Sequence, residues 1–311
     1  MTTHPSLRSD LEDYLRLRRA LGFKLESAGR LLGQFVDYLQ TRGVDTITTD
    51  DALVWASLPA AACPHWRAIR VSAVRGFAAY LHGIDASVVV PPAGLVRSGP
   101  CRATPYLYSA AEIVSLLNAT TELRPPLRAA TYHTVIGVLA VSGMRIGEVI
   151  ALDDGDLDVE HDLLVVRDSK FGKSRLVALH STTTAAVVRY QQLRDELRPW
   201  RSSPALFVSS VGTRLLHSNI SLTFAGLTQR SGIVRRSASC RPRVHDLRHA
   251  FAVASLLDCY ANGGDVPAML PRLATYLGHT DPKHTFWYLS AAPELMALAG
   301  QRLGTHLERG A

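Results

Sequence analysis

The stretch VVVPPAGLVRSGP, residues 88–100, divides the chain into two segments of different character. Its prolines and glycines do not continue a helix or a strand, and such a composition is typical of a linker. With 311 residues the chain exceeds the usual size of one domain, and each segment is long enough to bury a core of its own. The sequence therefore predicts a first domain over residues 1–95, a linker over 96–104 and a second domain over 105–311.

The pattern of apolar residues predicts the fold class. Leu31, Phe35 and Leu39 repeat every four positions in the first segment, which indicates a helix with one buried face. The second segment is also largely helical in pattern, except over LLVVRDSKFGKSRLVAL, residues 163–179, where two β-branched runs flank a glycine-containing turn. That pattern indicates a β-hairpin, which a strand near residues 151–157 could join. We expect a mainly α fold with a small antiparallel sheet, of the α+β class.

The composition excludes several classes of protein. No run of eighteen apolar residues occurs, and the opening MTTHPSLRSDLEDY lacks the charged-then-apolar pattern of a secretion signal, so we expect a cytoplasmic protein without a membrane span. The four cysteines form no C-x-x-C pair, which argues against a zinc ribbon and against a disulfide framework. The formal net charge of +7 favours a polyanionic partner such as nucleic acid.

The motif SGMRIGEV places Arg145 just after the helix-breaking Gly143. At the start of the helix that follows, unpaired N–H groups and the positive end of the helix dipole attract anions. A guanidinium adds a planar fork that can bind two oxygens of a phosphate. Glu148 lies on the same helical face and could hold the Arg145 side chain in place, although the two could also form an ordinary helical ion pair.

The motif HDLRH, residues 245–249, permits two interpretations. His245 stands at an expected helix start, with Arg248 one turn further on the same face. As at Arg145, an arginine is thus expected close to a helix N-terminus. The spacing is also that of the zinc-protease motif H-E-x-x-H, with Asp246 in place of the glutamate. The shorter aspartate is a poorer general base at that reach, and Arg248 would bring a fixed positive charge close to the metal. We therefore expect no metal here.

Three further residues stand next to expected turns. Lys170 lies in the hairpin turn, where most lysines are only solvated, but a lysine, unlike an arginine, can give up a proton during a reaction. His279 follows Gly278, a typical residue for the end of a helix. Tyr288 belongs to TFWYL, whose four successive large side chains would point all the way round a helix. One or more of them should face a cleft or a partner, although a tyrosine in such a run is more often a core residue.

In their order and spacing these residues resemble the site of the tyrosine recombinases, the phage-integrase family of site-specific DNA recombinases. The six matching positions are Arg145, Lys170, His245, Arg248, His279 and Tyr288. The resemblance implies a helical core-binding (SAM-like) DNA-binding domain over residues 1–95. It implies a mixed α/β catalytic domain with a C-terminal tail helix over residues 105–311. The sequence LPRLATYLGH, followed by TFWYL, is more similar to transposon-borne members of the family than to chromosome-dimer resolvases.

The resemblance also implies the course of the reaction. Tyr288 would attack a DNA phosphate, release a 5′-hydroxyl and form a 3′-phosphotyrosyl link. Lys170 would protonate the leaving 5′-oxygen, and His245 would assist proton transfer to or from the tyrosine. Because the protein–DNA ester conserves the energy of the broken bond, neither a cofactor nor a metal is expected.

The remaining positions would bind the phosphate and the DNA around it. Arg145 and Arg248 would stabilise the negative charge of the pentavalent transition state, and His279 would donate a hydrogen bond to the phosphate. Glu148 is a supporting residue. The residues expected to contact DNA nearby are Lys173, Arg175 and Arg243.

The partner that the resemblance implies is double-stranded DNA with specific recombination sites, bound by a homotetramer with or without related recombinase subunits, at the nucleoid. The event would be integration, excision or transposition of a mobile element. A type IB topoisomerase and a non-catalytic DNA-binding protein are the alternatives. The separate N-terminal helical domain favours a site-specific recombinase over a topoisomerase. The complete set of six residues argues against a non-catalytic DNA-binding protein.

Overall fold

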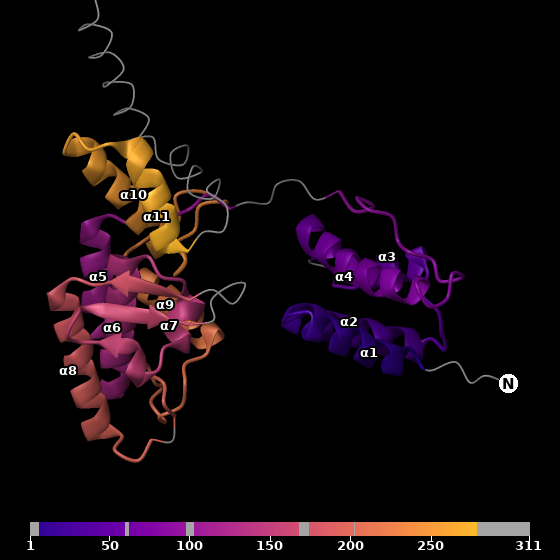
Figure 1. Ribbon diagram of the computed structural model, residues 1–311, viewed down its shortest axis with the longest axis horizontal. Helices are drawn as coiled ribbons and strands as arrows, with labels where there is room; N and C mark the ends of the chain where they lie inside the picture. Colours follow the sequence, from indigo (N-terminus) through magenta and orange to yellow (C-terminus); the bar gives the residue numbers. More distant parts are fainter. Residues whose placement is uncertain (1–5, 60–61, 98–102, 168–173, 202, 279–311) are drawn as a thin grey trace, which may run out of the picture. The chain divides into compact units, whose positions relative to one another are not determined.

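The computed structural model describes residues 6–59, 62–97, 103–167, 174–201 and 203–278 (Figure 1). The chain forms two compact units, residues 1–102 and 103–311. Most described residues are helical, and the described strands form one small antiparallel sheet. This confirms the predicted fold class. None of the described helices is long and apolar enough to cross a membrane.

The first unit is a bundle of helices built on the predicted apolar faces. Its helices are α1 (Leu7–Ala20), α2 (Glu26–Thr41), α3 (Thr49–Ser57) and α4 (Pro64–His82). The Thr48 hydroxyl accepts a hydrogen bond from the Asp51 amide (3.1 Å) and caps α3, as expected of threonine at a helix start. Phe35, Trp55 and Phe77, from α2, α3 and α4, are almost fully buried. The unit therefore has a hydrophobic core of its own.

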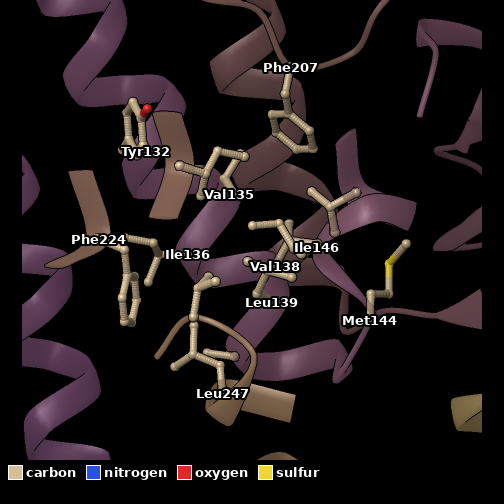
Figure 2. Close-up of a cluster of buried hydrophobic side chains, with 14 of the residues drawn as sticks. Tyr132, Val135, Ile136, Val138, Leu139, Met144, Ile146, Phe207, Phe224 and Leu247 are labelled. Atoms are coloured by element: carbon tan, nitrogen blue, oxygen red, sulfur yellow. The ribbon is translucent and has the colours of Figure 1, made fainter. Parts of the chain in front are cut away.

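The second unit contains the remaining elements. Its α-helices are α5 (Ala110–Thr120), α6 (Pro126–Ser142), α7 (Ile146–Ala151), α8 (Ser181–Leu197), α9 (His217–Arg230), α10 (Asp246–Ala261) and α11 (Val266–Leu277). Helix α6 packs against α5, α8 and α10. Its side chains Val135, Ile136 and Leu139 share one hydrophobic core with Phe224 of α9 and Leu247 of α10 (Figure 2). A central helix buried on several faces fixes the positions of the shorter elements at its ends.

The sheet has the strand order β1-β2-β3, with β1 (Leu157–Asp158), β2 (Leu163–Val166) and β3 (Arg175–Ala178). Strands β2 and β3 are the two arms of the predicted hairpin and pair with Leu163 opposite Ala178. The prediction of a strand near residues 151–157 was wrong over most of that range. The Asp156 carboxylate accepts a hydrogen bond from the Asp153 amide (2.9 Å) and stabilises a 3₁₀ turn, η1 (Asp154–Asp156), so the strand begins only at Leu157.

Helices α10 and α11 lie together at one end of the second unit, coloured orange to yellow in Figure 1. They share a small apolar cluster that includes Leu256, Val266 and Leu273. Strand β3 contacts α11, and α7 directly follows the end of α6. Hydrogen bonds from Arg145, the N-cap residue of α7, to the carbonyls of Leu277 and Gly278 show that the C-terminal end of α11 lies close to the start of α7.

Candidate active site

Two of the predicted arginines meet at the end of α11. Arg248 of α10 donates a hydrogen bond from Nη2 to the Leu277 carbonyl (2.7 Å) and from Nη1 to the Gly143 carbonyl (2.8 Å). Arg145 donates from Nη2 to the Gly278 carbonyl (3.0 Å) and more weakly from Nη1 to that of Leu277 (3.5 Å). The last carbonyls of a helix lack intrahelical partners and carry the negative end of its dipole. They therefore attract cations from two other parts of the chain.

Glu148 joins the Arg145 side chain to a third arginine, Arg175 of β3. Its Oε1 accepts hydrogen bonds from Nη1 of Arg145 (2.8 Å) and from Nη1 of Arg175 (2.9 Å). Its Oε2 accepts from Nη2 of Arg175 (2.8 Å) and from the Arg145 amide at the start of α7 (2.9 Å). Burial alone would raise the pKa of Glu148, but the hydrogen bonds from Arg175 and Arg145 lower it to about 2. The carboxylate is therefore ionised at neutral pH.

Gly143 makes the tight connection between α6 and Arg145 possible. It ends α6 in the left-handed conformation, with φ 59°, which glycine adopts without steric cost. A side chain at this position would also overlap the ring of Phe251. This glycine turns its carbonyl to Arg248 and places Arg145 at the N-cap of α7.

His245 occupies the N-cap position of α10 and keeps part of its surface exposed to solvent, although protein atoms surround the ring. Its ring packs edge-on against that of His249, with centroids 4.9 Å apart. The protein atoms crowded around the imidazole lower the pKa of His245 to about 4, helped by the positive charges of Arg248 and Arg243. His245 is therefore neutral at pH 7 and able to accept a proton.

Asp246 holds the start of α10 in place. Its fully buried carboxylate accepts hydrogen bonds from the Arg243 amide (3.1 Å), Nε (3.0 Å) and Nη2 (2.8 Å). Burial raises the pKa of Asp246, and the Arg243 guanidinium partly offsets that effect. A carboxylate enclosed in this way cannot act as the general base that the zinc-protease interpretation requires. Among the described residues, no cluster of histidine, cysteine and acidic side chains suits a metal ion.

The two described arginines expected to contact DNA both have protein partners. The Arg175 side chain is only 13% exposed, and its guanidinium binds Glu148 and the Tyr276 carbonyl (2.9 Å). The Arg175 side chain is therefore turned toward the protein, whereas the sequence predicted a DNA contact for it. Its neighbour Val177 is buried, and residues two apart on a strand share a face, so strand alternation could have indicated the inward position of Arg175. The half-exposed Arg243 side chain pairs with Asp246.

Four predicted site residues lie outside the described residues: Lys170, Lys173, His279 and Tyr288. The described chain reaches both ends of the hairpin turn, at Arg167 and Ser174, and ends at Gly278. Within it, the structure brings Arg145, Glu148 and Arg248 together around the last carbonyls of α11.

Integrases are among the solved structures that share this fold. The Tn1549 transposon integrase in complex with transposon right end DNA matches with a TM-score of 0.65 at 16% identity, over 96% of this chain and 100% of that one. A lambda integrase tetramer bound to a Holliday junction matches with a TM-score of 0.62 at 16% identity, over 92% of this chain and 78% of that one. At these identities the likeness concerns the fold.

The sequence itself identifies the family. Residues 108–294 match the family described as the phage integrase family. A putative integrase/recombinase of Sinorhizobium fredii, y4rB, is 41% identical over 305 residues, which cover 96% of this chain and 97% of that protein. The chain therefore belongs to the phage integrase family of tyrosine recombinases, as the ordered motifs predicted.

Proposed function

We propose that this protein is a site-specific recombinase that cleaves and rejoins DNA through a 3′-phosphotyrosyl intermediate on Tyr288. The observation that carries the proposal is the meeting of Arg145 and Arg248 at the Leu277 carbonyl. Two guanidiniums whose Nη atoms reach one oxygen are close enough together to bind one phosphate. Arg145 is also partly exposed, with 28% of its side chain accessible, so an incoming phosphate can reach it.

The proposed reaction is a transesterification. The Tyr288 oxygen attacks the phosphorus, the bond from phosphorus to the 5′-oxygen breaks, and Lys170 gives its proton to that leaving oxygen. Arg145 and Arg248 stabilise the added negative charge of the pentavalent transition state. Loss of one such donor typically costs about 3–4 kcal/mol of barrier. Rejoining is the reverse reaction, with the 5′-hydroxyl of another strand as the nucleophile.

His245 is the proposed acceptor of the tyrosine proton. A free tyrosine has a pKa of about 10 and is mostly protonated at neutral pH, so its attack needs a base. The pKa of His245, lowered to about 4, leaves the imidazole neutral and its acceptor nitrogen unprotonated. Once a phosphate is bound, its negative charge would favour the imidazolium form and so favour the transfer.

The proposed partner is double-stranded DNA with specific recombination sites. The first unit, with its separate helical core, acts as the core-binding domain and the second as the catalytic domain, joined by a linker over residues 96–104. The lambda integrase tetramer on a Holliday junction supports a homotetramer on DNA, with or without related subunits. The protein would act in the cytoplasm at the nucleoid, during integration, excision or transposition of a mobile element.

The test is covalent capture of DNA. A duplex that carries the site the protein selects from a random library is nicked near the cleavage position. The short fragment that carries the released 5′-hydroxyl then diffuses away, so that rejoining fails and the 3′-phosphotyrosyl adduct accumulates. We expect the wild-type protein to form an adduct that resists SDS and the Tyr288→Phe variant to form none. An adduct that persists in the variant would overturn the assignment of the nucleophile. Relaxation of supercoiled DNA without sequence preference would instead indicate a topoisomerase.

A further inference from the structure

We propose that Arg175 is a positioning residue of this site, which holds the Arg145 guanidinium in place through Glu148 and fixes the end of α11. The inference rests on the proposed recombinase function. It gives Arg175 a different role from the DNA contact expected of a hairpin arginine.

The geometry of the Arg175–Glu148 pair suits a positioning role. Two parallel hydrogen bonds join the guanidinium to the two carboxylate oxygens, at 2.9 and 2.8 Å. A third bond runs from Nε to the Tyr276 carbonyl (2.9 Å). The planar fork of an arginine fixes both the distance and the orientation of a carboxylate. Arg175 therefore links β3 rigidly to α7 and to the last turn of α11.

Glu148 is shared between Arg175 and Arg145. Its Oε1 accepts a hydrogen bond from Arg145 as well as one from Arg175, and only 8% of the residue is exposed. Without Arg175, a buried carboxylate would keep a single guanidinium partner. Such a carboxylate either takes up a proton or draws its remaining partner closer. Both outcomes would move Arg145 away from the position in which it can bind a phosphate.

Arg175 also fits closely against Gly278. A Cβ atom at position 278 would lie 3.0 Å from Nη1 and 3.2 Å from Cζ of Arg175, so the guanidinium rests against a residue that has no side chain. The Gly278 carbonyl is also an acceptor for Arg145 (3.0 Å). Arg175 thereby supports both the carboxylate and the carbonyl that hold Arg145. Gly278 directly precedes the predicted site residue His279 in sequence.

The experiment compares Arg175→Met and Arg175→Lys with the wild type on the nicked duplex, at saturating protein. We expect Arg175→Met to slow adduct formation by about tenfold or more, since small displacements of reacting groups cost that much. Its DNA dissociation constant should stay within about threefold of the wild-type value. Arg175→Lys should recover part of the rate, because it restores the charge beside Glu148 without the fork. An unchanged rate, or a loss confined to DNA affinity, would overturn the inference.

A second readout separates positioning from a general loss of structure. Replacing a non-bridging oxygen of the scissile phosphate by methyl removes the negative charge that a guanidinium neutralises. Arg145→Ala and Arg175→Met should therefore both lose less rate on the methylphosphonate than on the phosphate. The double variant should be no slower than Arg145→Ala alone. Equal losses of Arg175→Met on both substrates, or multiplied losses in the double variant, would contradict action through Arg145.

The matched control is Arg214→Met. Arg214 also binds α7, through the carbonyls of Ile150 (2.7 Å) and Leu152 (3.2 Å) at its C-terminal end, but has no contact with Glu148. The Arg214→Met variant should have a lower melting temperature, but any loss of rate should be the same on the methylphosphonate as on the phosphate. If Arg175→Met does not fold, Glu148→Gln replaces it in both experiments. The slower adduct formation and the smaller loss on the methylphosphonate are then expected of Glu148→Gln, and the same contrary results would overturn the inference. A wild-type protein without any adduct would sink the proposed function, whereas a fast Arg175→Met variant would sink only the role of Arg175.

Discussion

Arg145 and Arg248 donate hydrogen bonds to the same oxygen, the carbonyl of Leu277, at 3.5 and 2.7 Å. One belongs to the start of α7 and the other to the first turn of α10, so they meet only through the fold. The shared acceptor is the last residue of α11. The structure thus brings two distant sequence motifs to one point, where the proposed phosphate would bind.

Arg248→Lys should slow the cleavage reaction more than a comparable substitution elsewhere in the second unit. Arg248 is 2% exposed and bridges the carbonyls of Gly143 and Leu277, and a lysine cannot hold both in the geometry of a fork. We expect adduct formation on the nicked duplex to slow by about 10²-fold. Arg128→Lys, which changes an arginine that joins α6 to Thr223 of α9 (3.0 Å), is the control. A similar loss in both variants would argue against a special role for Arg248.

Gly143→Ala should destabilise the protein. The left-handed backbone costs a residue with a side chain about 1–2 kcal/mol, and overlap with Phe251 adds strain. Gly147→Ala is the matched control, because this helical glycine has open space around its Cβ position and alanine favours helices. We expect urea denaturation to give a loss of about 2 kcal/mol or more for Gly143→Ala and no loss for Gly147→Ala. Equal stabilities of the two variants would contradict this explanation of the turn.

Glu148→Gln should change how stability depends on pH. The folded-state pKa of Glu148, about 2, lies below its ordinary value of 4.5. Its contribution to stability is therefore present above pH 4.5 and is lost as the pH falls toward 2. Between about pH 5 and pH 3 the wild type should lose more free energy of unfolding than the glutamine variant, by about 2 kcal/mol. Parallel curves for the two proteins, measured by chemical denaturation, would exclude this ionised cluster.

His245 should be neutral in the DNA-free protein well below the usual range for histidine. Its pKa of about 4 compares with an ordinary value of 6.5 and follows from the crowded surroundings of the ring and from the nearby arginines. An NMR titration of the imidazole, assigned with His245→Gln, should therefore show protonation near pH 4. A midpoint near 6.5 would mean that the ring is hydrated and remote from the arginines, which would contradict the surroundings described for it.

Local patterns in the sequence predicted much of this architecture. The β-branched runs around the turn predicted β2 and β3, and the SGMRIGEV motif predicted the pairing of Arg145 with Glu148, which the structure contains. Both features depend on residues close together in sequence. The motifs also carried the resemblance to the phage integrase family, which the comparisons confirm.

Contacts between distant segments were beyond the reach of those patterns. Strand alternation can indicate that Arg175 points inward, but not that its partner is Glu148, 27 residues away, because that contact depends on how the fold brings β3 and α7 together. The acceptors of Arg145 lie 132 and 133 residues further along the chain and are backbone carbonyls, which no side-chain motif can indicate. The short strand β1 was misplaced because two aspartates stabilise a 3₁₀ turn where the pattern suggested an extended chain.

In the proposed mechanism, two arginines at the end of α11 serve a tyrosine nucleophile. The most direct measurement is mapping of the covalent link by mass spectrometry, after the wild-type protein reacts with the nicked duplex. We expect the peptide that contains Tyr288 to carry the 3′-phosphate of the cleaved strand, and Arg145→Ala and Arg248→Lys to reduce its yield steeply at equal DNA binding. A link to any other residue, or an undiminished yield in both arginine variants, would contradict the account.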